Sequence, residues 1–120
     1  MLSPPSPNPA MPSKPLVAAS SRPLVLSILA RGESYGYAII QEVKQLSGGQ
    51  LEWTDGMLYP VLHRLEREGL IEATWGESDT GRKRKYYRLT EPGGTALKAE
   101  RAQWLGVHNT LAQLWGLNPA

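Results

Sequence analysis

The sequence of 120 residues predicts a mostly α-helical domain with one two-stranded β hairpin, followed by a long C-terminal helix. Apolar residues recur at helical spacing in three successive segments between residues 23 and 68, and again after residue 90. Between these segments, the runs LIEATW and RKRKYYRL have strand character and flank the turn-rich stretch GESDTG. A chain of this length corresponds to a single domain.

The composition limits the classes of function. The chain has no cysteine, which excludes disulfides, thiolate metal sites and cysteine nucleophiles. Its two histidines, His63 and His108, lie far apart, so we expect no metal site and no cofactor. A net charge of +2 is mildly basic. No apolar run is long enough to span a bilayer and no signal peptide is evident, so we expect a soluble, cytoplasmic protein without membrane contact.

Proline and serine dominate residues 1–22, and we expect this segment to be a disordered tail. Its Lys14 and Arg22 are candidates for a basic arm on DNA, but the sparse charges favour a dispensable extension. We expect residues 117–120 to form a second short tail. From Pro23 the composition changes, and we expect the first helix there, ending before Gly32.

A second helix is expected after Ser34, which is a candidate cap. Its apolar positions form one stripe, and two glycines follow its end. The stripe consists of Ile39, Ile40, Val43 and Leu46, and the glycines are Gly48 and Gly49.

The third helix lies in TDGMLYPVLHRLEREGLIE, residues 54–72. Leu58, Leu62 and Leu65 fall on one face with Val61, while small, aromatic and hydroxyl side chains occupy the other face. Because a proline is tolerated near a helix start, Pro60 predicts that the helix begins late, near residue 56 or 57. Such an exposed N-terminal end can enter a DNA major groove. The alternative is an ordinary amphipathic helix with a solvated polar face.

Four consecutive cations, Arg82, Lys83, Arg84 and Lys85, follow the turn between the predicted strands. Cations on an edge strand can simply prevent edge-to-edge aggregation. Four together beside a helix that can enter a groove favour contacts with DNA phosphates. Of the tyrosines that follow, one is expected to pack on the core and the other to reach a phosphate oxygen.

Three helices followed by a hairpin is the plan of a winged helix-turn-helix domain, here residues 23–90. The segments YGYAII, DGMLYPVLHRLEREGLIE and RKRKYYRLTEPG closely resemble the PadR family of transcriptional regulators. The resemblance implies a homodimer that binds double-stranded DNA, usually a repressor released by a small ligand. By position it implies that the second helix, the recognition helix and the wing supply the DNA contacts. These residues are Tyr35, Tyr37, Thr54, Gly56, Met57, Tyr59, Pro60, His63, Arg64, Arg82, Lys83, Arg84 and Lys85. Gly94 departs from the family, which has a basic residue there.

The last helix, residues 91–116, carries an apolar seam that is typical of a dimerisation helix. Leu97, Trp104 and Leu111 are spaced by seven residues, with Val107 and Leu114 beside them. Packing on its own domain is the alternative. In short PadR-like regulators that bind drugs, a tryptophan at this position lines a flat aromatic pocket. That resemblance implies a planar aromatic effector at Trp104 and His108, whereas a tryptophan that only fills a dimer core remains open.

Two other functional classes remain to be weighed. The chain lacks the residues that an enzyme needs, since it has no phosphate-binding glycine loop and no nucleophile with a nearby base. A winged-helix protein-interaction module is the stronger rival because a fold does not fix a function. Four adjacent cations favour DNA binding over such a module, and the resemblance implies that the DNA-binding protein is a ligand-responsive repressor on a near-palindromic operator.

Overall fold

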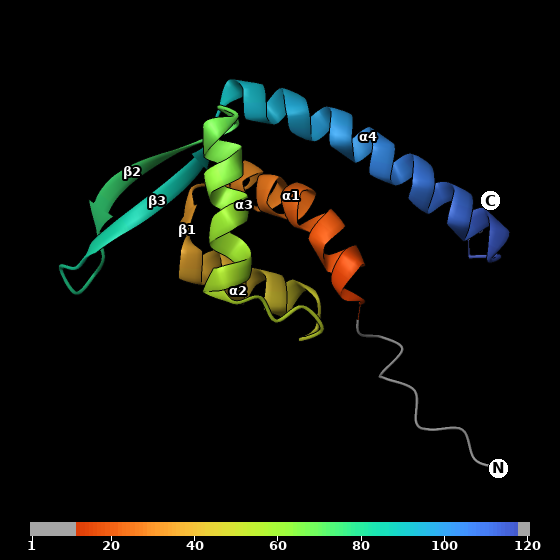
Figure 1. The fold of residues 1–120 in the computed structure, drawn as a ribbon, viewed down its shortest axis with the longest axis horizontal. Helices are drawn as coiled ribbons and strands as arrows, with labels where there is room; N and C mark the ends of the chain where they lie inside the picture. Colours follow the sequence, from red (N-terminus) through yellow and green to blue (C-terminus); the bar gives the residue numbers. More distant parts are fainter. Residues whose placement is uncertain (1–11, 118–120) are drawn as a thin grey trace, which may run out of the picture.

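Four helices and three strands make up the part of the chain that the computed structural model describes, residues 12–117 (Figure 1). In chain order they are α1 (Lys14–Ala30), β1 (Ser34–Tyr35), α2 (Gly36–Leu46), α3 (Asp55–Arg67), β2 (Ile71–Glu77), β3 (Lys83–Leu89) and α4 (Glu91–Leu114). The predicted class, mostly helical with a β hairpin as a wing, is confirmed.

Helix α1 begins earlier than the sequence suggested. The prediction of a disordered tail is wrong for residues 14–22, which are helical, while residues 1–11 lie outside the described residues. Ser13 starts the helix because its hydroxyl oxygen accepts a hydrogen bond from the Leu16 N–H (3.4 Å) and Pro15 fits a first turn. Val17 packs against the core, and this burial helps the helix to accommodate Pro23 in its interior.

Helix α3 also starts earlier than predicted, at Asp55 after the N-cap residue Thr54. Pro60 therefore lies in the second turn rather than at the helix start. The N–H that proline lacks would have bonded to the carbonyl of Gly56, and Gly56 is exposed, so solvent can replace the lost donor. The predicted inner face is confirmed, since Leu58, Leu62 and Leu65 are buried.

The sheet contains one strand that the sequence did not reveal. β2 and β3 form the predicted antiparallel hairpin, and β1 pairs with the other edge of β3. Ser34, predicted to cap α2, instead lies opposite Tyr87 in this strand, and Tyr35 is the N-cap residue. Two residues are too few to show a strand's period of two, which explains why β1 was missed.

One hydrophobic core joins α1, α2, α3 and the inner face of the hairpin. Tyr87 of β3 is buried within it, and Trp53, in the loop before α3, is only 5% exposed. Both bury a polar atom, the Tyr87 hydroxyl and the Trp53 Nε1, that has no hydrogen-bond partner among the described residues. Burial raises the pKa of Tyr87 to about 12, because a phenolate would lose its hydration there.

A tight joint connects the hairpin to α4. The Thr90 hydroxyl donates to the Gly69 carbonyl (2.7 Å) and accepts from the Gly93 N–H (3.1 Å), which caps α4. Gly93 lies so close to the Leu70 carbonyl that a Cβ at this position would be 2.0 Å from the oxygen. From this joint α4 runs outward past α1 (Figure 1).

An ion-pair cluster fixes α4 against the rest of the domain. Arg22 of α1 donates from Nε to both carboxylate oxygens of Glu100 (3.1 and 3.0 Å) and from Nη1 to Glu68 (2.7 Å). The hydrogen bond from Arg22 holds the pKa of Glu68 below its ordinary value. One side chain thus links α1, α4 and the residue that caps α3.

Candidate nucleic-acid interface

We define the wing as β2, β3 and residues 78–82 between them. The predicted phosphate contacts lie along its outer part. The turn is closed by hydrogen bonds from the Ser78 N–H to the Arg82 carbonyl (2.8 Å) and from the Gly81 N–H to the Ser78 carbonyl (2.9 Å). Arg82 and Lys83 are exposed beside it. Since side chains alternate along a strand, Lys83 and Lys85 share a face with Tyr87, and Arg84 shares the opposite face with Tyr86.

Arg84 is held by an aromatic pair that spans β1 and β3. Its guanidinium carbon lies 3.8 Å from the ring centroid of Tyr35, a cation–π contact. Tyr35 in turn meets Tyr86 edge to face, with centroids 5.7 Å apart. Tyr35 was predicted to contact DNA, and the structure gives it a second role as a support for an arginine of the wing.

Lys85 is partly engaged within the protein. Its ammonium lies 3.8 Å from a carboxylate oxygen of Glu66 on α3 and 5.4 Å from the ring of Tyr87. This long, half-exposed ion pair is weak, so a phosphate can replace the carboxylate at little cost. Lys85 is therefore less freely available than Arg82 and Lys83, which form no ion pair with a described residue.

Tyr59 connects α3, the predicted recognition helix, to the start of α2. A Cβ on Gly36 would lie 2.6 Å from the Tyr59 hydroxyl oxygen, so the ring reaches α2 because this position has no side chain. Tyr59 remains 37% exposed and its ring centroid lies 6.2 Å from that of His63. Tyr37, on the first turn of α2, is 66% exposed.

These groups meet in one surface groove, which we call the wing groove, of about 490 Å³. Its walls come from β1, the start of α2, α3 and the wing. The lining residues are Tyr35, Gly36, Tyr37, Tyr59, Arg82, Lys83, Arg84 and Lys85. The lining contains four cations, three tyrosines and no carboxylate, which suits a polyanion.

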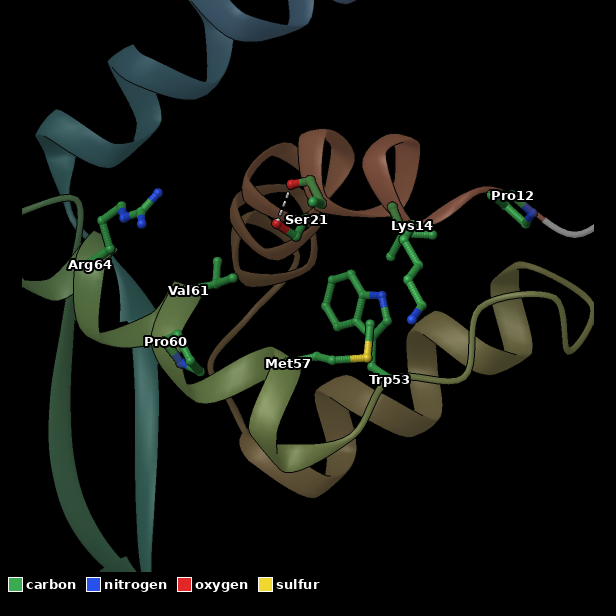
Figure 2. Close-up of a pocket in the computed structure, with 10 residues that line it drawn as sticks. Pro12, Lys14, Ser21, Trp53, Met57, Pro60, Val61 and Arg64 are labelled. Carbon is green, nitrogen blue, oxygen red and sulfur yellow. Dashed lines mark hydrogen bonds between the residues drawn. The ribbon is translucent and has the colours of Figure 1, made fainter.

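Other predicted DNA contacts do not line the wing groove. Met57, Pro60 and Arg64 line a second cavity, between α1, Trp53 and α3 (Figure 2). Thr54, Gly56 and His63 are exposed on or just before α3, but they line neither cavity. The structure therefore divides the predicted contacts on α3 between two surfaces.

The candidate dimerisation residues lie along α4. Leu97 is partly buried against the core, so it packs within its own domain. Farther along, Val107 and Leu114 are mostly exposed, at 58% and 77%, whereas Trp104 and Leu111 are exposed by only 38% and 36%. His108 is exposed on the same stretch.

Sequence reasoning missed three residues that shape the interface: Gly36, Trp53 and Glu66. The motif YGY, with a glycine between two tyrosines at a helix start, was a signal that an aromatic ring approaches there. Trp53 and Glu66 gave no local signal, because their partners lie on other elements. Within residues 12–117, no cluster of three potential metal ligands occurs, and no helix has the length and apolarity needed to cross a membrane.

Comparison with known proteins shows which family and which proteins the chain is similar to. Residues 25–99 match the model of the transcriptional regulator PadR-like family. The chain is 39% identical over 83 residues to the transcriptional regulator Rv3488 of Mycobacterium tuberculosis, covering 69% of this chain and 74% of that protein. It is 35% identical over 82 residues to the transcriptional regulator YqjI of Escherichia coli, covering 68% of this chain but 38% of that protein.

Solved structures agree with the sequence relatives. A PadR-like transcriptional regulator from Bacillus cereus superposes with a TM-score of 0.75 at 29% identity, covering 85% of this chain and 97% of that one. A transcriptional regulator from Clostridium thermocellum gives a TM-score of 0.77 at 26% identity, covering 86% and 97%. The superposed length includes most of the elements described above.

Proposed function

Because the chain belongs to the PadR-like family of transcriptional regulators, we propose that it is a ligand-responsive repressor that binds a near-palindromic operator as a homodimer. The observation that carries this proposal is the wing groove, where four cations and three tyrosines from separate elements form one surface without a carboxylate. Duplex DNA offers the matching partner, a dense line of phosphates beside base edges.

In this proposal the residues divide into two tasks. Arg82, Lys83, Arg84 and Lys85 neutralise phosphates and position the protein, which adds affinity for any duplex. Tyr59, with the exposed residues on its helix, enters the major groove and discriminates among sequences. Tyr35 holds the guanidinium of Arg84 in place before DNA arrives, so less side-chain entropy is lost on binding.

The exposed apolar part of α4 supports dimerisation. A helix of 24 residues is about 36 Å long, and its outer half carries large apolar side chains that the described part of its own subunit leaves partly or mostly exposed. A second copy of α4 would cover them, and a twofold axis would place two recognition helices on successive half-sites about 34 Å apart. Trp104 and His108 would then face the dimer centre, where a planar aromatic effector can stack on the tryptophan.

The test of DNA binding begins with a selection of genomic fragments on the purified protein, followed by sequencing. We expect enrichment of one inverted repeat. The affinity for that operator is then measured over a range of salt concentrations for the parent, Arg84→Ala and the control Arg101→Ala, which removes an equal charge from the exposed face of α4. Arg84→Ala should lower the salt slope by about 1, and the control should not.

Two results would count against the proposal. Equal salt slopes in the parent and Arg84→Ala would remove the wing from the phosphate contacts. Binding without enrichment of any repeat would favour an interaction module over a sequence-specific regulator.

For the recognition helix, Tyr59→Ala should lose preference for the operator, and Tyr59→Phe separates the contribution of the hydroxyl from that of the ring.

Dimerisation has a separate test. Val107→Asp changes a side chain that is 58% exposed, so it should leave the subunit folded while lowering the sedimentation coefficient from that of a dimer to that of a monomer. Trp104→Ala should weaken binding of a planar aromatic probe at the dimer centre. A Val107→Asp variant that sediments like the parent would argue against an α4 interface.

A further inference from the structure

Arg22 of α1 links two helices that the proposed function assigns to different tasks. Its Nε donates to both carboxylate oxygens of Glu100 on α4 (3.1 and 3.0 Å), and its Nη1 donates to a carboxylate oxygen of Glu68 (2.7 Å). Glu68 is the C-cap residue of α3. The helix proposed to form the dimer is therefore joined to the end of the helix proposed to read DNA. We call these three residues the Arg22 cluster.

The geometry of the Arg22 cluster is better than that of an ordinary surface ion pair. The side chains of Arg22 and Glu100 are only 33% and 20% exposed, and each contact is a charge-assisted hydrogen bond. Isolated surface pairs contribute little to stability, whereas several charges held in good geometry contribute more. Arginine presents its N–H groups in a fixed plane, so a lysine could not bind both carboxylates in the same way.

The same contacts occupy the charge of Arg22 within the protein. Arg22 was a candidate for a basic arm on DNA, but its guanidinium faces the carboxylates of Glu68 and Glu100. Two carboxylates already satisfy this cation, so it adds little attraction for a phosphate. The role of Arg22 therefore lies in how it holds the helices together.

Glu100 is the last residue of α4 that polar contacts fix to its own domain. Thr90 and Gly93 hold the start of the helix, and Ala96 and Leu97 pack against the core. After Glu100, no described residue of α4 forms a hydrogen bond or an ion pair with another element. The Arg22 cluster is thus the outermost polar anchor of this helix.

A small change of angle at this anchor produces a large displacement at the far end of α4. Leu114 lies fourteen positions beyond Glu100, which is about 21 Å along the helix axis. A tilt of about 10° at Glu100 would move Leu114 by about 4 Å relative to α3, close to the rise of about 3.4 Å per base pair. Because α4 passes α1 as it leaves the domain (Figure 1), a contact with α1 at Glu100 opposes such a tilt.

We propose that Arg22 is a positioning residue that determines which half-site spacing the regulator accepts. By fixing α4 to the end of α3, the Arg22 cluster holds the two recognition helices of a dimer at one separation and one angle. One base pair more or less between the half-sites moves a half-site by about 3.4 Å and turns it by about 35° about the DNA axis. A dimer with a fixed α4 cannot follow this change. The inference rests on the proposed function, because it requires a dimer formed through α4 and an inverted repeat.

The spacing test uses the full chain and the enriched inverted repeat. Fluorescence anisotropy measures the dissociation constants for this operator and for two versions with one base pair inserted or removed at the centre. The ratio of the dissociation constants for shifted and native operators is the spacing selectivity. We expect a ratio of at least about ten for the parent and a ratio at least about threefold smaller for Arg22→Met, which keeps an unbranched side chain but loses both ion pairs.

Further variants assign the effect to the cluster. Glu100→Gln removes the charge that holds α4 and should lower the selectivity as Arg22→Met does, whereas Glu68→Gln leaves that contact in place and should have a smaller effect. Arg22→Lys restores the charge without the planar geometry, so it should recover the selectivity only in part. Arg31→Met is the matched control, because it removes an ion pair with Glu42 (2.9 Å) that does not involve α4. It should keep the selectivity of the parent.

A distance measurement tests the anchor without DNA. The chain has no cysteine, so Asp79→Cys at the exposed turn of the wing provides the only site for a nitroxide label in each subunit. Double electron–electron resonance then reports the distance between the two labels of a dimer. The parent should give one narrow distribution of distances. Arg22→Met should broaden this distribution, and Arg31→Met should not.

The outcomes separate the anchor from the proposed function. Equal spacing selectivity in the parent and Arg22→Met would overturn the inference even when the operator is bound, and so would an equal loss in Arg31→Met. A distance distribution that Arg22→Met leaves unchanged would also overturn it. Dimers that enrich no repeat would refute the proposed function and with it the spacing role, while a broadened distribution in them would still support the anchor. A protein that stays monomeric would overturn both.

Discussion

Gly93 is the glycine at which an added side chain would clash most severely with the rest of the structure. A Cβ there would lie 2.0 Å from the Leu70 carbonyl oxygen and 2.8 Å from Leu89 Cδ1. Carbon and oxygen normally approach to about 3.3 Å, so the backbone of α4 or of Leu70 would have to shift by more than about 1 Å. The same carbonyl accepts a hydrogen bond from the Thr90 N–H (3.0 Å), so this shift strains the joint between the hairpin and α4.

These contacts set the expected magnitude for Gly93→Ala. Overpacking costs about 1–3 kcal/mol, and a weakened backbone hydrogen bond costs about 1 kcal/mol more. Alanine recovers up to about 1 kcal/mol through its higher helix propensity. The net expectation is a loss of about 1–3 kcal/mol in the free energy of unfolding.

Gly94→Ala is the matched control. A Cβ at Gly94 would meet only Leu89 Cδ2 at 4.0 Å, an ordinary contact, so the substitution should stabilise the protein by up to about 1 kcal/mol. Urea unfolding followed by circular dichroism measures both variants under identical conditions. If Gly93→Ala is as stable as Gly94→Ala, then α4 does not approach Leu70 as described and the reasoning is refuted.

Three further predictions concern groups outside the interface. Tyr87→Phe should raise the free energy of unfolding measured in urea by about 1 kcal/mol, because it removes a buried hydroxyl without a partner. The parent should lose stability between pH about 10 and 12, where the unfolded chain ionises this tyrosine but the folded state keeps the proton. Tyr87→Phe should abolish this loss. Glu68 has a lowered pKa, so its stabilising effect is complete above pH about 4.3 and is lost as the pH falls through the lowered value. Glu68→Gln should therefore flatten the acid side of a plot of melting temperature against pH. An unchanged acid side would show that Arg22 does not stabilise the Glu68 carboxylate. Gly106→Ala should stabilise by about 1 kcal/mol in thermal unfolding of dilute protein, since the added Cβ would have no atom within 4 Å beyond the local backbone of its own helix, and destabilisation would reveal an unseen neighbour at that position.

Local patterns were sufficient for the main helices and the hairpin. The inward residues of α3 recur at helical spacing, and the strand runs flank a turn with a glycine at φ +80°, Gly81. The order of these elements, together with the family motifs, was enough to predict the class. The same local reasoning failed at Lys14, because proline statistics take no account of the tertiary packing of Val17, which stabilises the start of α1.

The candidate site was only partly accessible from the sequence. The cations of the wing and the exposed face of α3 were predicted as separate sets, because charge runs and periodicity are properties of single segments. The groove that brings the wing cations together with Tyr59 depends on β1, a strand of two residues that pairs with β3. A contact such as that of Arg84 with Tyr35 joins residues far apart in the chain, and no local pattern encodes it.

By itself, then, the sequence determined the order of the elements, the apolar faces and the positions of the cations, since these follow from short-range spacing and side-chain chemistry. Only the tertiary structure decided that Lys85 is partly engaged by Glu66, that Gly93 permits α4 to leave the domain at its observed angle, and that a donor on Trp53 is buried without a partner. Each of these depends on the distance between atoms on different elements, and packing of the whole domain sets that distance.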